Sequence, residues 1–122
     1  MSNEKSLEMK ERIYKLVLIL IRLIQKIPND NVSRILVNQI TRSSTSIIAN
    51  YVEGQSGVSR KEFTNFIAIS LKSANETNLW LTMMKDLGYV TSSKYEEVIP
   101  ELNAISNILG ASVKKLRASK LN

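Results

Sequence analysis

Apolar residues recur at intervals of three and four positions in four segments of this 122-residue chain, which is the spacing of amphipathic helices. No segment alternates with the period of two that a half-buried strand requires, and no Asn-Gly or Asp-Gly hairpin turn occurs. Short connections make successive helices antiparallel neighbours. The sequence therefore predicts one all-α domain over 1–122, an up-down-up-down antiparallel four-helix bundle with helices over about 5–27, 32–53, 59–87 and 92–119.

The residues around and within the second helix are distinctive. Pro28 disfavours helical backbone at the residue before it, so the first helix is predicted to end there. Gly54 and Gly57 can adopt a positive φ and are predicted to end the second helix. The middle of this helix is rich in small residues, which predicts a close approach to a neighbouring helix: Thr41, Ser43, Ser44, Thr45, Ser46 and Ala49.

Capping signals mark the starts of the third and fourth helices. Ser59 and Glu62 have the spacing of a capping box, in which each side chain satisfies a backbone N–H of the first turn. Ser93 and Glu96 repeat this spacing at the start of the fourth helix. Pro100 follows beyond the first turn, which predicts either a kink in this helix or a later start.

The chain contains no Cys and no His, which excludes many enzyme classes. A Cys nucleophile, a Ser-His-Asp triad, a Cys/His zinc site and a helical di-iron site with Glu-x-x-His motifs all require these residues. We therefore expect a protein without enzymatic activity, cofactor or metal. The sequence also lacks the pattern of a signal peptide, and its most apolar run, 16–21, is too short to span a bilayer, so we expect a cytoplasmic protein.

Positive charge is concentrated near the C-terminus. The chain has 17 Lys and Arg against 11 Asp and Glu, and the segment 111–122 contains no acidic residue. This pattern favours an anionic partner, RNA or DNA. Its candidate contacts are Lys114, Lys115, Arg117 and Lys120. Arg60 and Lys61 are further candidates, because cations at a helix start oppose the helix dipole, although simple solvation is the alternative.

The first helix has more apolar residues than one buried stripe requires. Beyond the predicted core face, apolar residues also occupy the opposite side: Tyr14, Leu18, Ile19 and Ile21. A helix on the surface of a monomer normally keeps that side polar. We therefore predict that these residues form the interface of a homo-oligomer. The alternative is a thick core covered by the terminal segments.

Three polar residues on the second and third helices are candidates for a carboxylate site. Asn50 and Glu53 lie on one helix, and Glu76 lies among apolar residues of the next, so the carboxylates could approach each other. A catalytic or metal-binding pair is one interpretation. We favour a structural role, in which the three residues cap backbone groups or bond to Arg42 and Ser73, because carboxylates without His are weak indicators of chemistry.

Several short motifs between 28 and 90 resemble a known family. They are Gln39-Ile40-Thr41-Arg42, Asn50-Tyr51-Val52-Glu53-Gly54, Lys61-Glu62-Phe63 and Leu87-Gly88-Tyr89. The combination is similar to the four-helix-bundle family encoded in intervening sequences of bacterial 23S rRNA genes, which is related to the accessory variability proteins of diversity-generating retroelements. The resemblance implies a barrel-like homopentamer and, from the retroelement relatives, binding to nucleic acid and a reverse transcriptase.

The chain departs from the family pattern in two places. Members commonly have Ser-Ile-Pro-Ser-Asn where this chain has Ser46-Ile47-Ile48-Ala49-Asn50, so a proline kink is not expected there. Members often have paired basic residues before the run of small residues, of which only Arg42 is present as a candidate nucleic-acid contact. The sequence thus predicts a ring-like nucleic-acid-binding homo-oligomer, an accessory factor to a reverse transcriptase or rRNA-associated element. The alternative is a protein-interaction scaffold without nucleic-acid binding.

Overall fold

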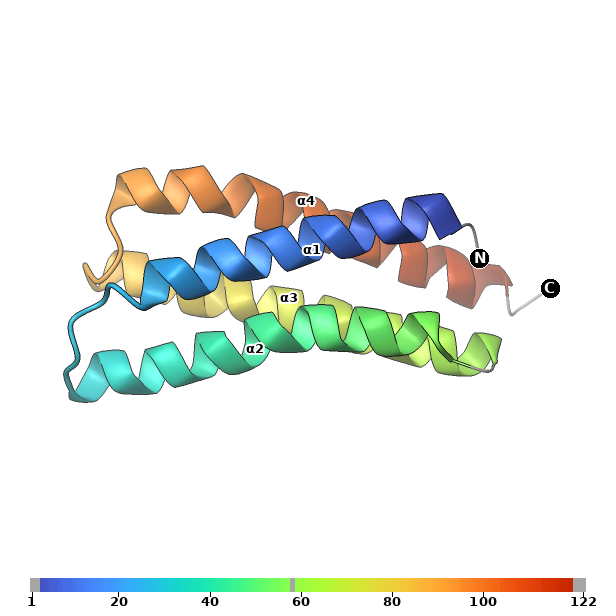
Figure 1. Cartoon of the computed structure of the whole chain (residues 1–122), viewed down its shortest axis with the longest axis horizontal. Coiled ribbons are helices and arrows are strands. Elements are labelled where there is room, and N and C mark those ends of the chain that lie inside the picture. Colours follow the sequence, from blue (N-terminus) through green and yellow to red (C-terminus); the bar gives the residue numbers. More distant parts are fainter. Residues whose placement is uncertain (1–2, 58, 120–122) are drawn as a thin grey trace.

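The computed structural model describes residues 3–57 and 59–119, which form four helices (Figure 1). Their bounds are α1 Asn3–Ile24, α2 Asn31–Gln55, α3 Arg60–Asp86 and α4 Ser92–Ser119. Each helix runs antiparallel to the next, and α4 packs back against α1 to close the bundle. The predicted all-α antiparallel four-helix bundle is confirmed. None of these helices is both long and apolar enough to cross a bilayer.

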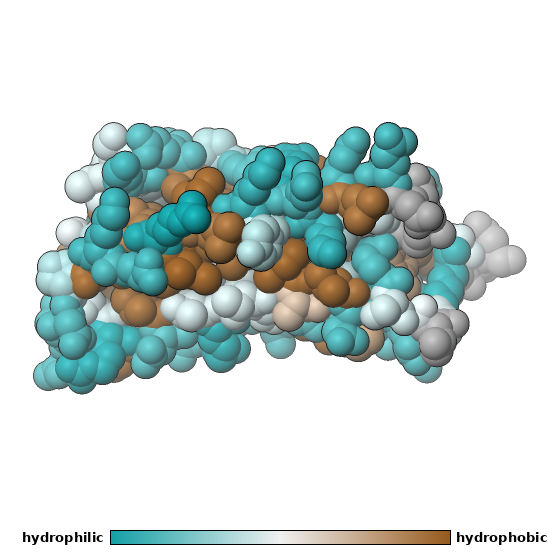
Figure 2. Space-filling model, viewed as in Figure 1, coloured by the Kyte–Doolittle hydropathy of each residue, from teal (hydrophilic) through white to brown (hydrophobic). Residues whose placement is uncertain are grey.

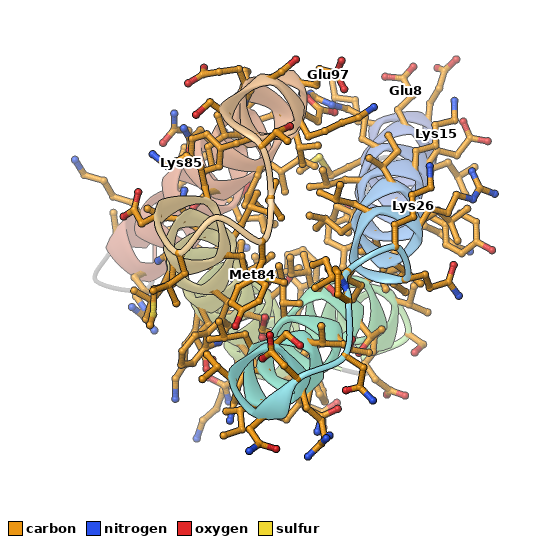
Figure 3. The ribbon with its side chains drawn as sticks, turned by 90° about the vertical axis from the view of Figure 1, so that its left-hand side faces the viewer. Glu8, Lys15, Lys26, Met84, Lys85 and Glu97 are labelled. Atoms are coloured by element: carbon orange, nitrogen blue, oxygen red, sulfur yellow. The ribbon has the colours of Figure 1, made fainter. Side chains whose placement is uncertain are left out.

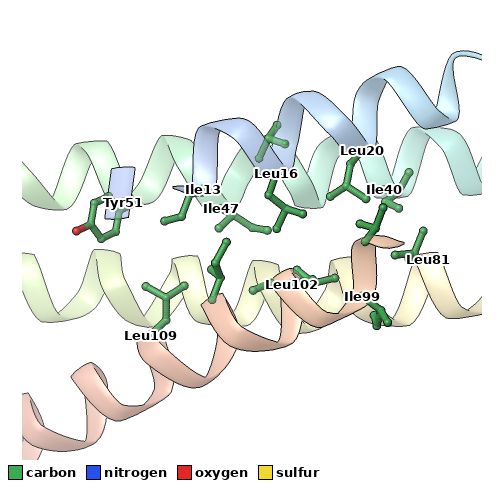
Figure 4. Packing of buried hydrophobic residues seen from close by; sticks show 14 of the residues in the cluster. Ile13, Leu16, Leu20, Ile40, Ile47, Tyr51, Leu81, Ile99, Leu102 and Leu109 are labelled. Carbon is green, nitrogen blue, oxygen red and sulfur yellow. The ribbon is translucent and has the colours of Figure 1, made fainter. Parts of the chain in front are cut away.

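All four helices contribute to one apolar core (Figure 4). The completely or almost completely buried residues include Ile13, Leu16, Leu20, Ile40, Ile47, Leu81, Leu102, Ile105 and Leu109. An end-on view shows the same division of side chains, because Met84 points between the helices whereas Lys15 and Lys26 point outward (Figure 3). The helical spacing of apolar residues therefore places them in a common interior.

α1 ends at Ile24, earlier than predicted. The backbone N–H groups of Lys26 and Ile27 bond to carbonyls three residues back, at 3.3 and 3.2 Å, so the last turn tightens before Pro28 is reached. α2 then begins with a capping box. The Asp30 carboxylate accepts from the Ser33 N–H, and the Ser33 hydroxyl accepts from the Asp30 N–H, both at 2.8 Å.

The prediction that Gly54 ends α2 through a positive φ is wrong. It lies inside α2, and among the described residues only Gly88 has a positive φ. A Cβ at Gly54 would lie 3.2 Å from the Cβ of Phe66 and 3.4 Å from the Cδ1 of Ile67. The close approach of α3 therefore favours glycine here, because α3 would have to shift by a few tenths of an ångström to accept a side chain, and the prediction named the right residue for the wrong reason.

The predicted starts of α3 and α4 are confirmed, but the capping residue predicted for α4 is wrong. The Ser59 hydroxyl accepts from the Glu62 N–H at 3.1 Å. At α4, Thr91 is the capping residue, because its hydroxyl accepts from the Lys94 N–H at 3.1 Å, and Ser93 lies inside the helix. α4 continues through Pro100, so a later start there is wrong, whereas the kink stays a prediction.

The small residues of α2 lie against α3, which forms the most extensive helix pair of the bundle. The Ser70 hydroxyl of α3 donates to the backbone carbonyl of Ile47 in α2 at 2.8 Å. A side chain as short as serine reaches a neighbouring backbone only when two helices lie very close, so the predicted close approach is confirmed. Two hydroxyl pairs, each 2.8 Å apart, extend this seam: Thr77 with Ser43 and Ser73 with Ser46.

α1 and α4 have the least contact of any neighbouring helices. Across this seam the Arg12 guanidinium donates to both carboxylate oxygens of Glu101, at 2.7 and 2.9 Å. This pairing raises the pKa of Arg12 and lowers the pKa of Glu101 from their ordinary values. Both side chains are about two-fifths exposed, so the pair orients the two helices more than it stabilises them.

The Leu87-Gly88-Tyr89 motif links the connection between α3 and α4 to the connection between α1 and α2. Gly88 has a φ of 85°, which allows the Tyr89 N–H to bond back to the Met84 carbonyl at 2.8 Å. The Tyr89 hydroxyl then lies 3.0 Å from both carboxylate oxygens of Asp30. The end of α3 is thereby tied to the start of α2.

We predict that this contact makes the stability of the fold depend on pH. The Ser33 N–H and the Tyr89 hydroxyl donate to the Asp30 carboxylate and hold the pKa of Asp30 below its ordinary value of 3.8. The carboxylate therefore stabilises the fold above pH 3.8, and its contribution is lost as the pH falls through the lower folded value. Urea unfolding should show Asp30→Asn less stable than wild type at neutral pH, with the difference shrinking below pH 3.8. A difference independent of pH would contradict this assignment.

Candidate nucleic-acid interface

The helix order brings two groups of predicted cations to the same end of the bundle. α1 and α3 begin at this end, and α2 and α4 finish there, on the right of Figure 1. We define the basic end by five exposed residues: Arg60, Lys61, Lys114, Lys115 and Arg117. Lys120 lies outside the described residues. The sequence separates the two groups widely, and the antiparallel topology brings them together.

The three cations that α4 contributes to the basic end form no ion pair with a described carboxylate. Within the described parts of the chain, no carboxylate oxygen lies within 4.0 Å of the side-chain nitrogens of Lys114, Lys115 or Arg117. Successive helical residues point about 100° apart, so these three residues spread over an arc of about 160° on the outer side of α4. The positive potential therefore covers the outer side of this helix end.

Arg42 lies apart from the basic end, in the middle of α2. Its Nη2 donates to the Gln39 Oε1 at 2.8 Å and lies 3.5 Å from the Glu76 Oε2 of α3. A local carboxylate thus offsets its charge. The structure separates this candidate contact from the other cations.

The three candidate polar residues have different surroundings. The Asn50 amide donates to the backbone carbonyl and the hydroxyl of Ser46, both at 2.9 Å. Glu76 pairs with Arg42, and the Glu53 side chain is exposed. Across the described residues, no group of three or more Asp and Glu side chains is placed to hold a metal ion. The contact between Glu76 and Arg42 is one that the structural role predicts, whereas the bond from Asn50 to Ser46 was not predicted.

The apolar residues proposed as an oligomer interface divide between two flanks of α1. Tyr14, Leu18 and Ile21 follow helical spacing along one flank, whereas Ile19 lies on the other, in line with Arg12. Tyr14 is 54% exposed and Ile19 49% exposed, but Ile21 packs partly against the core. Apolar surface is visible on the face formed by α1 and α2 (Figure 2).

A second set of exposed apolar residues was not among the predicted interface residues. Leu79, Met83 and the C-cap residue Leu87 lie four residues apart along α3 and its end, and Val32 and Ile35 are exposed near the start of α2. The four-residue spacing was a usable signal, but it runs beside the buried stripe of the same helix. The bundle therefore exposes apolar side chains on two separate surfaces.

Comparisons with known proteins identify the family. A crystal structure of a protein of unknown function from the S23 ribosomal protein family of Bacteroides thetaiotaomicron VPI-5482 is 31% identical in sequence, with a TM-score of 0.82. The match covers 90% of this chain and 98% of that one. A search of curated proteins gave no match. The family model described as 23S rRNA-intervening sequence protein matches residues 5–111, and the chain therefore belongs to this family.

Proposed function

We propose that this chain is a non-enzymatic, self-associating, cytoplasmic protein that binds nucleic acid through the basic end of its bundle. The observation that supports the proposal most directly is the gathering of Arg60, Lys61, Lys114, Lys115 and Arg117 at one end, with no carboxylate within 4.0 Å of the three cations of α4 in the described chain. Such a surface attracts a phosphate backbone. An accessory role beside a reverse transcriptase or an rRNA-associated element fits this activity.

Self-association would increase the effect of these charges. The exposed apolar residues on α1 and those on α3 provide two different surfaces, as a ring built from head-to-tail contacts requires. In a homopentamer the basic end would recur five times around one axis, and the summed potential would hold a backbone more firmly than a single subunit. Light scattering at micromolar concentration should give a multiple of 13.8 kDa, and a mass of 13.8 kDa would contradict self-association.

Binding is tested by reversing the charges at the end of α4. Fluorescence anisotropy with a labelled RNA oligonucleotide at about 50 mM salt should show binding that weakens steeply as salt is added. The triple variant Lys114→Glu, Lys115→Glu, Arg117→Glu should lower the affinity roughly tenfold or more, because each cation that contacts a phosphate releases a counterion. The slope of log affinity against log salt concentration should become less negative by about 2 for a single strand.

A matched variant separates this effect from a change in net charge. Lys26→Glu, Arg34→Glu, Lys94→Glu changes the net charge by the same amount at exposed positions at the opposite end of the bundle. It should bind the oligonucleotide several-fold more tightly than the first variant. Equal losses in both variants would show that net charge alone acts, and no binding by the wild type at low salt would refute the proposal in favour of a protein-interaction scaffold.

A further inference from the structure

A hollow of about 860 Å³ opens at the basic end. All four helices line it: α1 contributes Lys10, α2 contributes Val52 and Gln55, α3 contributes Arg60 and Phe63, and α4 contributes Leu116. Its volume lies within the range of about 300 to 1,000 Å³ that is typical of small-molecule sites. Of these residues, only Arg60 was a candidate from the sequence.

Gln55 has an unusual environment in this hollow. Its side-chain Nε2 is buried and has no hydrogen-bond partner among the described residues. A buried amide donor without an acceptor costs free energy, and native proteins normally supply the acceptor from protein, water or a ligand. Because Nε2 is shielded from solvent, a group bound in the hollow reaches this donor only when the Gln55 amide rotates toward the hollow that the residue lines.

The remaining lining combines two kinds of group. Lys10 and Arg60 come from different helices and place two cations at the hollow. Phe63, Val52 and Leu116 provide an aromatic ring and aliphatic wall beside them. A free inorganic anion would use only the cations, whereas a nucleotide presents a phosphate to the cations and a flat base to the apolar wall. The lining is therefore complementary to a nucleotide.

We propose that this hollow receives one unstacked nucleotide of a single-stranded nucleic acid. The inference rests on the proposed function and specifies the class of nucleic acid that the basic end binds. Lys10 and Arg60 hold the phosphate, and the base lies against Phe63 and Val52. The Gln55 amide rotates out of its buried position and donates to a base or sugar oxygen. In a duplex the bases are paired and stacked, so no base enters the hollow without the cost of unstacking.

The first test fills the hollow. In anisotropy titrations, wild-type protein should bind a single-stranded RNA at least about tenfold more tightly than a blunt duplex of the same sequence, because base stacking on an aromatic side chain adds to affinity only for the single strand. Val52→Trp should remove most of this preference. The matched control is Val32→Trp at the opposite end of α2, where the valine is 50% exposed against 40% for Val52, and it should preserve the preference.

The second test uses the unpaired amide. Gln55→Leu should leave the thermal midpoint of the free protein unchanged or raised, because it removes a buried donor that lacks an acceptor. The same variant should bind the single strand several-fold more weakly. A purely structural role for Gln55 predicts the reverse, with lowered stability and unchanged binding.

The outcomes distinguish this inference from the proposed function. Equal binding of single strand and duplex, or a preference that Val52→Trp leaves intact, would refute the hollow as a nucleotide site while the basic end remains a nucleic-acid surface. If neither oligonucleotide binds, the proposed function and this inference both fail, and shifts of the Gln55 and Phe63 NMR signals by adenosine monophosphate would then indicate a site for free nucleotide. Displacement of the RNA by octanoate and not by adenosine monophosphate would assign the hollow to an anionic lipid and overturn the inference.

Discussion

Replacing Leu102 with alanine is expected to lower the free energy of unfolding by about 2 to 5 kcal/mol. Leu102 is completely buried in the centre of α4 and lies within the common core (Figure 4). The substitution removes its contacts and leaves a cavity that the surrounding helices fill only in part. The loss should be large because α4 has little contact with α1 and depends on core residues such as Leu102 to remain in the bundle.

Urea unfolding followed by circular dichroism measures this change, with protein concentration held constant because self-association contributes to apparent stability. Leu79→Ala is the matched control, since Leu79 is 53% exposed on the outer side of α3. Its effect should stay within about 0.5 kcal/mol. Equal unfolding midpoints for the two variants would show that α4 is not held by the core as described.

Replacing Ser70 with leucine is expected to lower the free energy of unfolding by about 1 to 3 kcal/mol or more. Ser70 is completely buried, and its hydroxyl lies 2.8 Å from the backbone carbonyl of Ile47. No space for a larger side chain exists between α2 and α3 at this point, so leucine must force the two helices apart.

Ser70→Ala separates the effect of volume from that of the hydrogen bond. It removes the hydroxyl without adding atoms and should cost only about 1 kcal/mol. Both variants are compared by urea unfolding at the same protein concentration. If leucine were tolerated as well as alanine, the close approach of α2 and α3 would be refuted.

The number and order of the helices could be predicted because periodicity is a local property of the sequence. The small residues of α2 and the cap at Ser59 were also readable, since both depend on short segments. Helix ends were harder to place. Thr91 and Ser93 are both good caps, and only the start of the backbone helix at Ser92 decides between them. Gly54 likewise suits a helix end as well as a close contact, and its role depends on a distant segment.

The candidate site was predictable to the extent that topology determines it. An antiparallel bundle necessarily brings the start of α3 and the end of α4 to one end, so Arg60 and Lys114 belong together once the fold is known. The pairing of Arg42 with Glu76 depends on the axial register of α2 against α3, which periodicity does not define. The hollow beside Gln55 depends on the packing of four helix ends at once, for which a single sequence contains no signal.

The hydroxyl groups between α2 and α3 place directional bonds in the interior of the bundle. Hydrogen bonds such as Ser70 to Ile47 have direction, so sliding one helix along the other breaks them. The side-chain bonds that join α4 to its neighbours, such as Asn78 to Asn103 and Arg12 to Glu101, lie at exposed or part-buried positions where water competes for them. The axial register of α2 against α3 is therefore held by bonds that solvent does not reach, whereas that of α4 depends on bonds open to solvent.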